Sequence, residues 1–276
     1  MRGEFVDLGM ARLYYYAAGT RGVGEPILLL HGFPTSSHLW SGVVPRLPSG
    51  HRVIVPDLLG FGRSELPRPG HIDSDLTVSG HATRIGQLLD ALHVDQACIA
   101  GHGMGAAVAL AIAVSQPRRV SRLCLVNAVT AASWPSRAAA TARGIMSLAP
   151  VLPSSWLVEC VRRALRLRSA EAAELTRSSD HYLRHFRGPA GRATLLAHLR
   201  ALTPRANFPP VPTALASPVA VVWGDRDPML SADMGHALAA HYPGSTLDVV
   251  AGGHYAPEES PEQVAAVVTR LLGDGG

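Results

Sequence analysis

The chain has 276 residues, of which 47% are hydrophobic, and a formal net charge of +4. This length and composition are ordinary for one globular unit with a large core. All basic residues are arginines, and residues 133–213 hold 12 of them against 4 acidic residues. We interpret these arginines as the solvated faces of helices, with attraction of an anionic substrate or an acidic carrier protein as the alternative. Basic and aromatic residues do not alternate as nucleic-acid binding requires, which argues against a nucleic-acid partner.

The first residues contain no apolar segment of the kind that a signal peptide requires, and no apolar run has the length of a membrane span outside segments typical of soluble elements. We therefore expect a cytoplasmic protein without a membrane partner. The three cysteines, an odd number, lack metal-binding spacing. Cys98 and Cys124 lie in apolar runs typical of strands, so buried and inert thiols are expected.

The first half of the chain alternates short apolar runs with segments of helical periodicity. Continuous apolar runs of this kind predict strands that are covered on both faces, and their alternation with helices predicts a parallel sheet. The predicted strands are Glu4–Leu8, Ala11–Ala17, Pro26–Leu30, Arg52–Pro56, Gln96–Ala100 and Arg122–Val126, the first two forming a hairpin around Gly9 and Met10. The predicted helices are Ser37–Leu47, Leu76–Leu92 and Met104–Val114.

The strand signal disappears after residue 130, where Ala, Leu and Arg dominate up to residue 213, interrupted by prolines. This pattern predicts an inserted helical cap over residues 131–213, with an α/β core formed by residues 1–130 and 214–276. The alternation then resumes with the strand Val219–Trp223, the helix Ala232–His241, the strand Thr246–Val250 and the helix Pro261–Leu272.

A glycine-rich turn, Gly101-His102-Gly103-Met104-Gly105, joins a predicted strand to a predicted helix. A sharp turn of the pattern G-x-S-x-G at such a place presents a nucleophile on a strained backbone. Here the flanking glycines of that pattern are present, and Gly103 stands at the centre, where the nucleophile is expected.

Three further loops carry side chains or backbone groups suited to acyl chemistry. His31-Gly32-Phe33-Pro34 follows a strand, and such loops supply a backbone N–H that stabilises an oxyanion together with the N–H after the nucleophile. The predicted donors are Phe33 and Met104. Asp227 and His254 follow two later strands, in the chain order of a catalytic triad, so we predict that Asp227 orients His254. Asp225 is the weaker candidate for the acid.

The segments Leu28–Trp40, Val55–Ser64 and Gly253–Pro261 together resemble the α/β-hydrolase superfamily, most closely its epoxide hydrolase and haloalkane dehalogenase branch. The resemblance covers residues 4–130 and 218–272, and it implies a mostly parallel eight-stranded sheet with a helical cap above the strand ends. Relatives in this branch carry Asp or Ser at the elbow centre, where this chain has Gly103.

Further positions depart from the two named activities. The family's dehalogenases bind halide with a Trp after the nucleophile and often an Asn in the His-Gly loop, and this chain has Met104 and Phe33 there. Epoxide hydrolases usually offer two cap tyrosines, and the cap here has Tyr182. Other candidates for substrate contact in the predicted cap are Trp134, Trp156, His181 and His185.

A glycine in the nucleophile's position leaves four interpretations. In the first, the chain is an ordinary hydrolase in which Ser or Asp has been replaced by engineering. In the second, it is a natural enzyme in which His254 acts as general base, for water activation or for lyase, cyclase or isomerase chemistry. In the third it is a non-catalytic ligand-binding protein, and in the fourth another residue supplies the nucleophile. His102 is expected to point away from the pocket. We favour the general-base enzyme.

The expected pocket lies between cap and core, near Gly103, His254 and Phe33, because ligands of α/β sheets bind at the carboxyl ends of the strands. Its neighbourhood is mainly Leu, Ala, Trp, Phe and Met, which favours a small, largely apolar organic substrate of the epoxide, ester or lactone class. No cofactor or metal is expected, because no dinucleotide, phosphate-loop or metal motif is present. The expected assembly is a monomer or a homodimer.

Overall fold

The computed structural model describes residues 2–9, 11–19, 24–65, 76–131, 152–170, 172–202 and 217–273, together with residues 144, 147, 208, 211, 212 and 215. Its centre is an eight-stranded sheet in the order β1-β2-β4-β3-β5-β6-β7-β8. β1 and β2 form an antiparallel hairpin, β2 pairs antiparallel to β4, and all later neighbours pair in parallel. The predicted mostly parallel eight-stranded sheet is therefore confirmed.

The strands follow the predicted apolar runs. β3, β4, β5 and β7 are buried along their whole length, as expected for strands covered on both faces. Cys98 and Cys124 lie on β5 and β6 and are completely buried, and burial raises the pKa of the Cys98 thiol to about 12. The strands are β1 Arg2–Asp7, β2 Arg12–Ala18, β3 Ile27–Leu30, β4 Val53–Pro56, β5 Ala97–His102, β6 Val120–Val126, β7 Val219–Gly224 and β8 Thr246–Val250.

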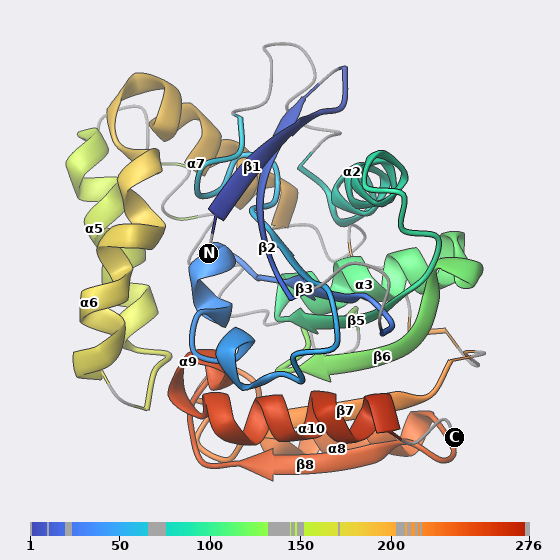
Figure 1. Ribbon diagram of the computed structural model, residues 1–276. Coiled ribbons are helices and arrows are strands. Elements are labelled where there is room, and N and C mark those ends of the chain that lie inside the picture. Colours follow the sequence, from blue (N-terminus) through green and yellow to red (C-terminus); the bar gives the residue numbers. More distant parts are fainter. Residues whose placement is uncertain are drawn as a thin grey trace.

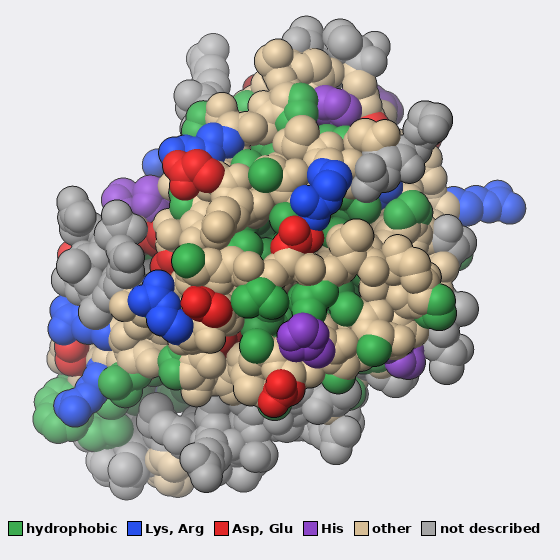
Figure 2. Space-filling view, turned by 90° about the horizontal axis from the view of Figure 1, so that it is seen from below, with side chains coloured by type: hydrophobic (Ala, Val, Ile, Leu, Met, Phe, Trp, Pro, Cys, Tyr) green, Lys and Arg blue, Asp and Glu red, His purple; other side chains and the backbone are tan. Residues whose placement is uncertain are grey.

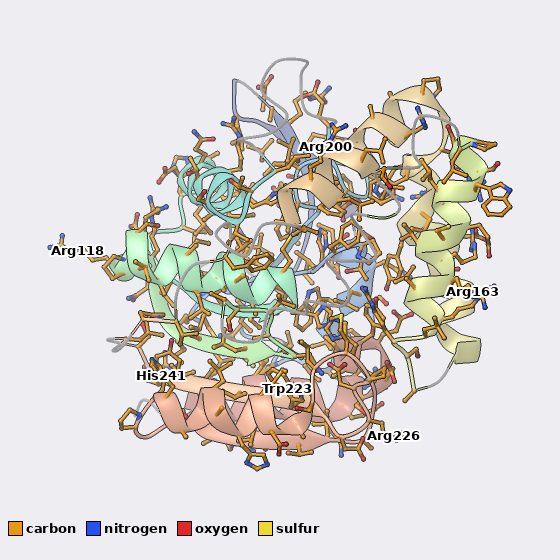
Figure 3. The ribbon with its side chains drawn as sticks, turned by 180° about the vertical axis from the view of Figure 1, so that it is seen from behind. Arg118, Arg163, Arg200, Trp223, Arg226 and His241 are labelled. Carbon is orange, nitrogen blue, oxygen red and sulfur yellow. The ribbon has the colours of Figure 1, made fainter. Side chains whose placement is uncertain are left out.

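Helices cover both faces of the sheet. α10 lies in front of the sheet in Figure 1, and α3 and α8 lie on the opposite face, which is seen in Figure 3. α2 packs against α3. These helices are α2 Val78–Ala91, α3 Met104–Ser115, α8 Ala232–His241, α9 Ala256–Glu259 and α10 Pro261–Gly273. On the surface that α10 and β8 share, Arg and acidic side chains are interspersed (Figure 2).

One predicted helix, Ser37–Leu47, is wrong. The structure has two short 3-10 helices there, η1 Ser37–Trp40 and η2 Val44–Arg46. Pro45 has no N–H to donate and disfavours helical geometry in the residue before it, so a continuous α-helix cannot run through this segment. Ser36 caps η1 by accepting a hydrogen bond from the His38 N–H.

The helices α5 Ser154–Arg166, α6 Ala172–Leu183 and α7 Gly188–Leu202 lie between β6 and β7 in the chain, with the 3-10 helix η5 Arg184–Phe186 before α7. We call residues 154–202 the α5–α7 segment. In Figure 1, α5 and α6 stand on the side to which the arrowheads of the parallel strands point. None of the helices among the described residues is both long and apolar enough to cross a membrane.

Candidate active site at the strand ends

The turn between β5 and α3 is built from glycines that are required for different reasons. A Cβ on Gly101 would lie 2.4 Å from the Gly105 carbonyl oxygen, and a Cβ on Gly105 would lie 2.4 Å from the Leu30 carbonyl oxygen. Both approaches are shorter than real Cβ contacts, so packing excludes a side chain at either position. The flanking glycines therefore allow the turn to pass close to β3.

Gly103, at the centre of the turn, has room for a side chain but an unfavourable backbone for one. Its φ is 56° and its ψ is −116°, a conformation that residues with a Cβ adopt only under strain. A Cβ there would lie 3.7 Å from His254 Nε2 and 3.9 Å from Gly32 Cα, both ordinary van der Waals distances. The position is open and faces an imidazole nitrogen.

His254 and Asp227 form a buried hydrogen-bonded pair. His254 follows β8 and Asp227 follows β7, and the distance from His254 Nδ1 to Asp227 Oδ2 is 2.8 Å. The side chains are 3% and 0% exposed. An ionised carboxylate only accepts hydrogen bonds, so Nδ1 carries a proton. When the imidazole is neutral, Nε2 is then the acceptor, and it faces the position of Gly103.

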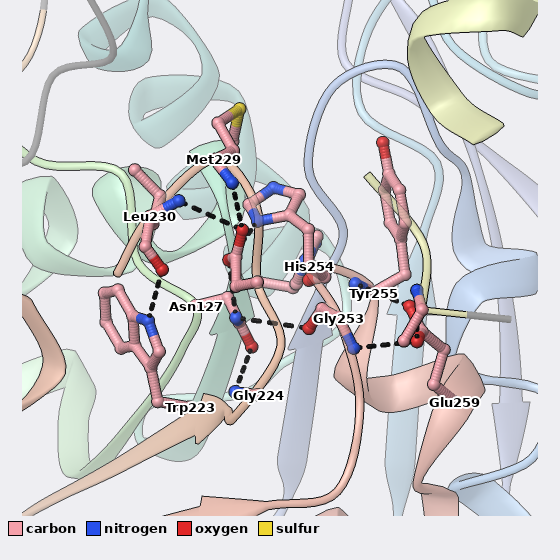
Figure 4. Close-up of polar contacts among 12 residues, drawn as sticks. Asn127, Trp223, Gly224, Met229, Leu230, Gly253, His254, Tyr255 and Glu259 are labelled. Atoms are coloured by element: carbon pink, nitrogen blue, oxygen red, sulfur yellow. Dashed lines mark hydrogen bonds and ion pairs between the residues drawn. The ribbon is translucent and has the colours of Figure 1, made fainter. Parts of the chain in front are cut away.

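Four donors converge on the Asp227 carboxylate (Figure 4). Besides His254, Asn127 Nδ2 donates to Oδ2 at 2.8 Å, and the N–H groups of Met229 and Leu230 donate to Oδ1 at 2.8 and 3.0 Å. Burial alone would raise the pKa of Asp227. The imidazole of His254 and the hydrogen bonds outweigh burial, so that pKa lies below its ordinary value.

Asn127 was not among the predicted site residues. It directly follows β6 and has a φ of 41°, in the left-handed region that Asn tolerates better than most residues. Its amide joins three strand ends, because Nδ2 also lies 3.5 Å from the Gly253 carbonyl oxygen and Oδ1 accepts from the Gly224 N–H at 3.4 Å. The sequence signal was weak, since a single Asn after a strand is common in turns.

The loop that carries His254 is held by backbone contacts on both sides. The His254 N–H donates to the Arg168 carbonyl oxygen at 2.9 Å, and its own carbonyl oxygen accepts from His102 Nε2 at 2.7 Å. Glu259 Oε2 accepts from the N–H groups of Gly253 and Ala170 at 2.7 and 3.0 Å. Arg168 and Ala170 lie between α5 and α6, so the α5–α7 segment helps to fix the imidazole.

The His31–Pro34 loop places a backbone N–H beside the turn. His31 Nε2 accepts from the Leu58 N–H at 2.9 Å, and its Nδ1 donates to the Gly32 carbonyl oxygen at 3.0 Å, which fixes a neutral ring. A Cβ on Gly32 would lie 3.2 Å from the Met104 nitrogen, so the two backbones are adjacent. Within the described part of the chain, the N–H groups of Phe33 and Met104 donate to no protein acceptor.

The other predicted site residues are distributed differently. Asp225 is half-exposed and accepts from the Gly252 N–H. The partner of His254 is Asp227. The Tyr182 hydroxyl donates to Glu258 Oε2 at 2.7 Å and is thereby held by the core. Trp156 is 63% exposed on α5, where nothing supports a pocket role. Trp134 lies outside the described residues.

His185 belongs to a group of histidines around Phe61 that the sequence analysis did not connect. The ring centroids of Phe61 and His198 are 3.9 Å apart, and those of Phe61 lie 6.2 and 6.3 Å from His81 and His185. Phe33 also lies near this group, with its ring centroid 6.2 Å from those of Phe61 and His198. We call His81, His185, His198 and Phe61 the Phe61 cluster.

The nitrogens of the Phe61 cluster are poorly paired. Both ring nitrogens of His81 and His185, and Nδ1 of His198, are buried without a hydrogen-bond partner in the part of the chain that the structure describes. Burial lowers the pKa of His81 to about 3, with a further contribution from His31. The described residues include no group of three or more side chains placed to hold a metal ion.

With this geometry established, comparisons with known proteins give the family. Residues 25–261 match the family model of the alpha/beta hydrolase fold. The chain is 31% identical to an uncharacterised protein of Mycobacterium tuberculosis, over 94% of this chain and 78% of that protein, and 29% identical to a haloalkane dehalogenase of Sphingobium indicum, over 98% and 94%. A solved alpha/beta hydrolase fold protein from Burkholderia ambifaria superposes with a TM-score of 0.82 at 26% identity, covering 98% of this chain and all of that one. The chain is a member of the α/β-hydrolase family.

Proposed function

We propose that the protein is an enzyme of the α/β-hydrolase family that acts on a small, largely apolar organic molecule without a covalent nucleophile. The observation that carries the proposal is the position of Gly103: a Cβ there would lie 3.7 Å from His254 Nε2, and the His254–Asp227 pair is complete at 2.8 Å. A base and its orienting acid are retained beside a position from which the attacking group is missing.

In this proposal, His254 Nε2 removes a proton from a water molecule bound beside Gly103, or from an acidic C–H bond of the substrate. Asp227 stabilises the imidazolium that results. When water attacks a carbonyl carbon, the N–H groups of Phe33 and Met104 meet the charge that develops on oxygen. The proton then passes from His254 to the leaving group, so that water is divided between the two products. Esters, lactones and epoxides are the substrate classes to test.

Replacement of the nucleophile in an ordinary esterase or epoxide hydrolase is the second candidate, and the open space at Gly103 favours it. A non-catalytic binding protein is supported less well. Burying an imidazole and a carboxylate is unfavourable unless both are well paired, and a receptor gains nothing from directing the free nitrogen at an open position.

A serine-directed probe tests the geometry without knowledge of the substrate. The Gly103→Ser variant should react covalently with a fluorophosphonate, because the new hydroxyl would lie between His254 Nε2 and the two N–H groups. The Gly103→Ser/His254→Ala double variant should react roughly 10²–10⁴-fold more slowly, the usual contribution of a positioned base. Equal labelling of the two variants would show that the imidazole does not serve this position.

Turnover of esters, lactones and epoxides by the unaltered protein then separates the two candidates. A general-base enzyme should hydrolyse or rearrange at least one class, with a loss of 10²–10⁴-fold in the His254→Ala variant. A hydrolase that lacks its nucleophile should be inactive as it stands and should gain several orders of magnitude from Gly103→Ser or Gly103→Asp.

A further inference from the structure

A cavity lies between the core and the α5–α7 segment, and Gly103 does not line it. Its volume is about 230 Å³, more than tenfold the roughly 10–15 Å³ that a single water needs. Its lining includes Tyr14 and Tyr16 from β2, His38 from η1, His181 from α6 and Arg184 from η5. Gly103, Phe33, Asp227 and His254 are not part of this lining, so the cavity is separate from the candidate active site.

Two guanidinium groups at the cavity lack a carboxylate partner among the described residues. Arg63 donates from Nη1 to the Tyr14 hydroxyl at 2.7 Å and lies over the Tyr14 ring, 4.9 Å from its centroid. Arg184 is exposed, and its guanidinium makes no hydrogen bond or ion pair within the described chain. Charged guanidinium groups in this state are available to a ligand.

A buried phenol at the cavity is also without a partner. Tyr16 is 9% exposed, and its hydroxyl makes no hydrogen bond to any described residue. Burial, followed by the nearby Asp57 carboxylate, raises the pKa of Tyr16, so the phenol stays neutral and can donate. Leaving such a group unpaired in a folded protein is unfavourable, and a ligand that accepts its hydrogen bond removes this penalty.

The remaining polar groups determine the charge of the ligand. Asp57 is buried, and its carboxylate accepts from the N–H groups of Ser37 and Arg63 at 2.7 and 2.8 Å. His38 and His181 stack with ring centroids 4.5 Å apart. Burial, His181 and Arg184 lower the pKa of His38 against the opposing effect of Asp57, so that ring is neutral at pH 7. Two arginines against one aspartate leave a single positive charge to balance.

We propose that this cavity binds a small organic carboxylate, held by Arg63, Arg184 and the Tyr16 hydroxyl. The singly charged carboxylate matches the charge of the lining, whereas a doubly charged phosphate would be repelled by Asp57. The Tyr14 and Tyr16 rings provide an apolar surface for the rest of the molecule. Because the lining comes from both the core and the α5–α7 segment, the ligand ties these two parts together.

Titration of the protein with benzoate, and separately with inorganic phosphate, tests the proposal by isothermal calorimetry and by the melting temperature. Benzoate should bind saturably and raise the melting temperature, and it should bind at least five-fold more tightly than phosphate. Tighter binding of phosphate, or no saturable binding of benzoate up to tens of millimolar, would overturn the assignment.

Variants locate the binding. Arg184→Gln and Tyr16→Phe should each weaken benzoate binding at least five-fold, and Arg163→Gln is the matched control. Arg163 is an exposed arginine on the same segment, outside the lining (Figure 3). Tyr16→Phe should leave the ligand-free protein at least as stable as before, since it removes an unpaired hydroxyl. His254→Ala should bind benzoate with unchanged affinity. Equal weakening by Arg163→Gln, or loss of binding in His254→Ala, would place benzoate elsewhere and refute the proposal.

Discussion

The candidate active site and the Phe61 cluster are both buried, both contain imidazoles and both contact the His31–Pro34 loop. They differ in how completely their polar groups are hydrogen-bonded. Around Asp227, four donors satisfy one carboxylate and orient the single imidazole of His254. In the Phe61 cluster, the ring nitrogens of His81 and His185 have no hydrogen-bond partner among the described residues. The first arrangement fixes a tautomer and a direction. The second keeps neutral rings in an apolar setting, at the expense of stability in acid.

The largest expected effect distinguishes glycines within one turn. Gly101→Ala should abolish folding or reduce the free energy of unfolding by more than about 4 kcal/mol, because its Cβ would collide with the Gly105 backbone. Gly103→Ala has room for its Cβ and should lose about 1–3 kcal/mol through backbone strain alone. Urea unfolding of both variants measures the difference. Equal losses would contradict the open position at Gly103.

The second expected effect concerns the amide of Asn127. Asn127→Gly keeps the positive φ without strain and removes one of the four donors to Asp227. In the Gly103→Ser background, fluorophosphonate labelling should slow about tenfold, as expected when roughly 1.4 kcal/mol of orienting hydrogen bonding is lost.

The control for Asn127→Gly is the labelling rate of Gly103→Ser combined with Trp156→Gln. Trp156 is exposed and remote from these contacts, so its replacement should leave the rate unchanged. If the Asn127→Gly variant is labelled as fast as this control, the hydrogen bond from Asn127 to Asp227 does not contribute to the orientation of His254.

The third expected effect is acid sensitivity from the Phe61 cluster. The folded-state pKa of His81 is about 3, below the ordinary 6.5, so between these values the unfolded chain binds a proton that the folded chain refuses. Stability is therefore lost as the pH falls below 6.5, at about 1.4 kcal/mol per pH unit for this one group. The free energy of unfolding, measured with denaturant between pH 6.5 and pH 4.5, should depend less steeply on pH in His81→Leu, by about this amount. An unchanged slope would mean that His81 is protonated in the folded protein.

The smallest expected effect tests the contact between the α5–α7 segment and the core. Tyr182→Phe removes the hydrogen bond to Glu258 and leaves the ring in place. The free energy of unfolding should fall by about 1–2 kcal/mol, since the partly buried Glu258 carboxylate loses the hydrogen bond from the Tyr182 hydroxyl. Leucine at the same position should cost more because it also removes ring packing against His38. If Tyr182→Phe abolished labelling of Gly103→Ser, a direct role at the site would replace this structural one.

Much of the architecture followed from short-range patterns. Continuous apolar runs located the buried strands, and the order of elbow, Asp227 and His254 predicted the pair that the structure joins. The predictions that were wrong or incomplete concern local backbone geometry and tertiary contacts, which the spacing of residues in the sequence does not reveal. Pro45 divided a predicted helix, Trp156 turned outward, and Asn127 acquired its role because three strand ends meet in space. His81 lies more than a hundred residues before His185 and His198 in the sequence, so their association required the tertiary fold.

Two contacts between the His254 loop and the α5–α7 segment affect how this protein can be re-engineered. The His254 N–H donates a hydrogen bond to the Arg168 carbonyl oxygen, and the Glu259 carboxylate accepts from both Gly253 and Ala170. Specificity in a scaffold of this kind would ordinarily be altered by grafting a foreign helical segment above the sheet. Here such a graft must also reproduce the short connection after α5, so that one carbonyl oxygen and one N–H occupy the positions of the Arg168 carbonyl oxygen and the Ala170 N–H. Otherwise replacing the α5–α7 segment would also remove the contacts that hold the imidazole of His254.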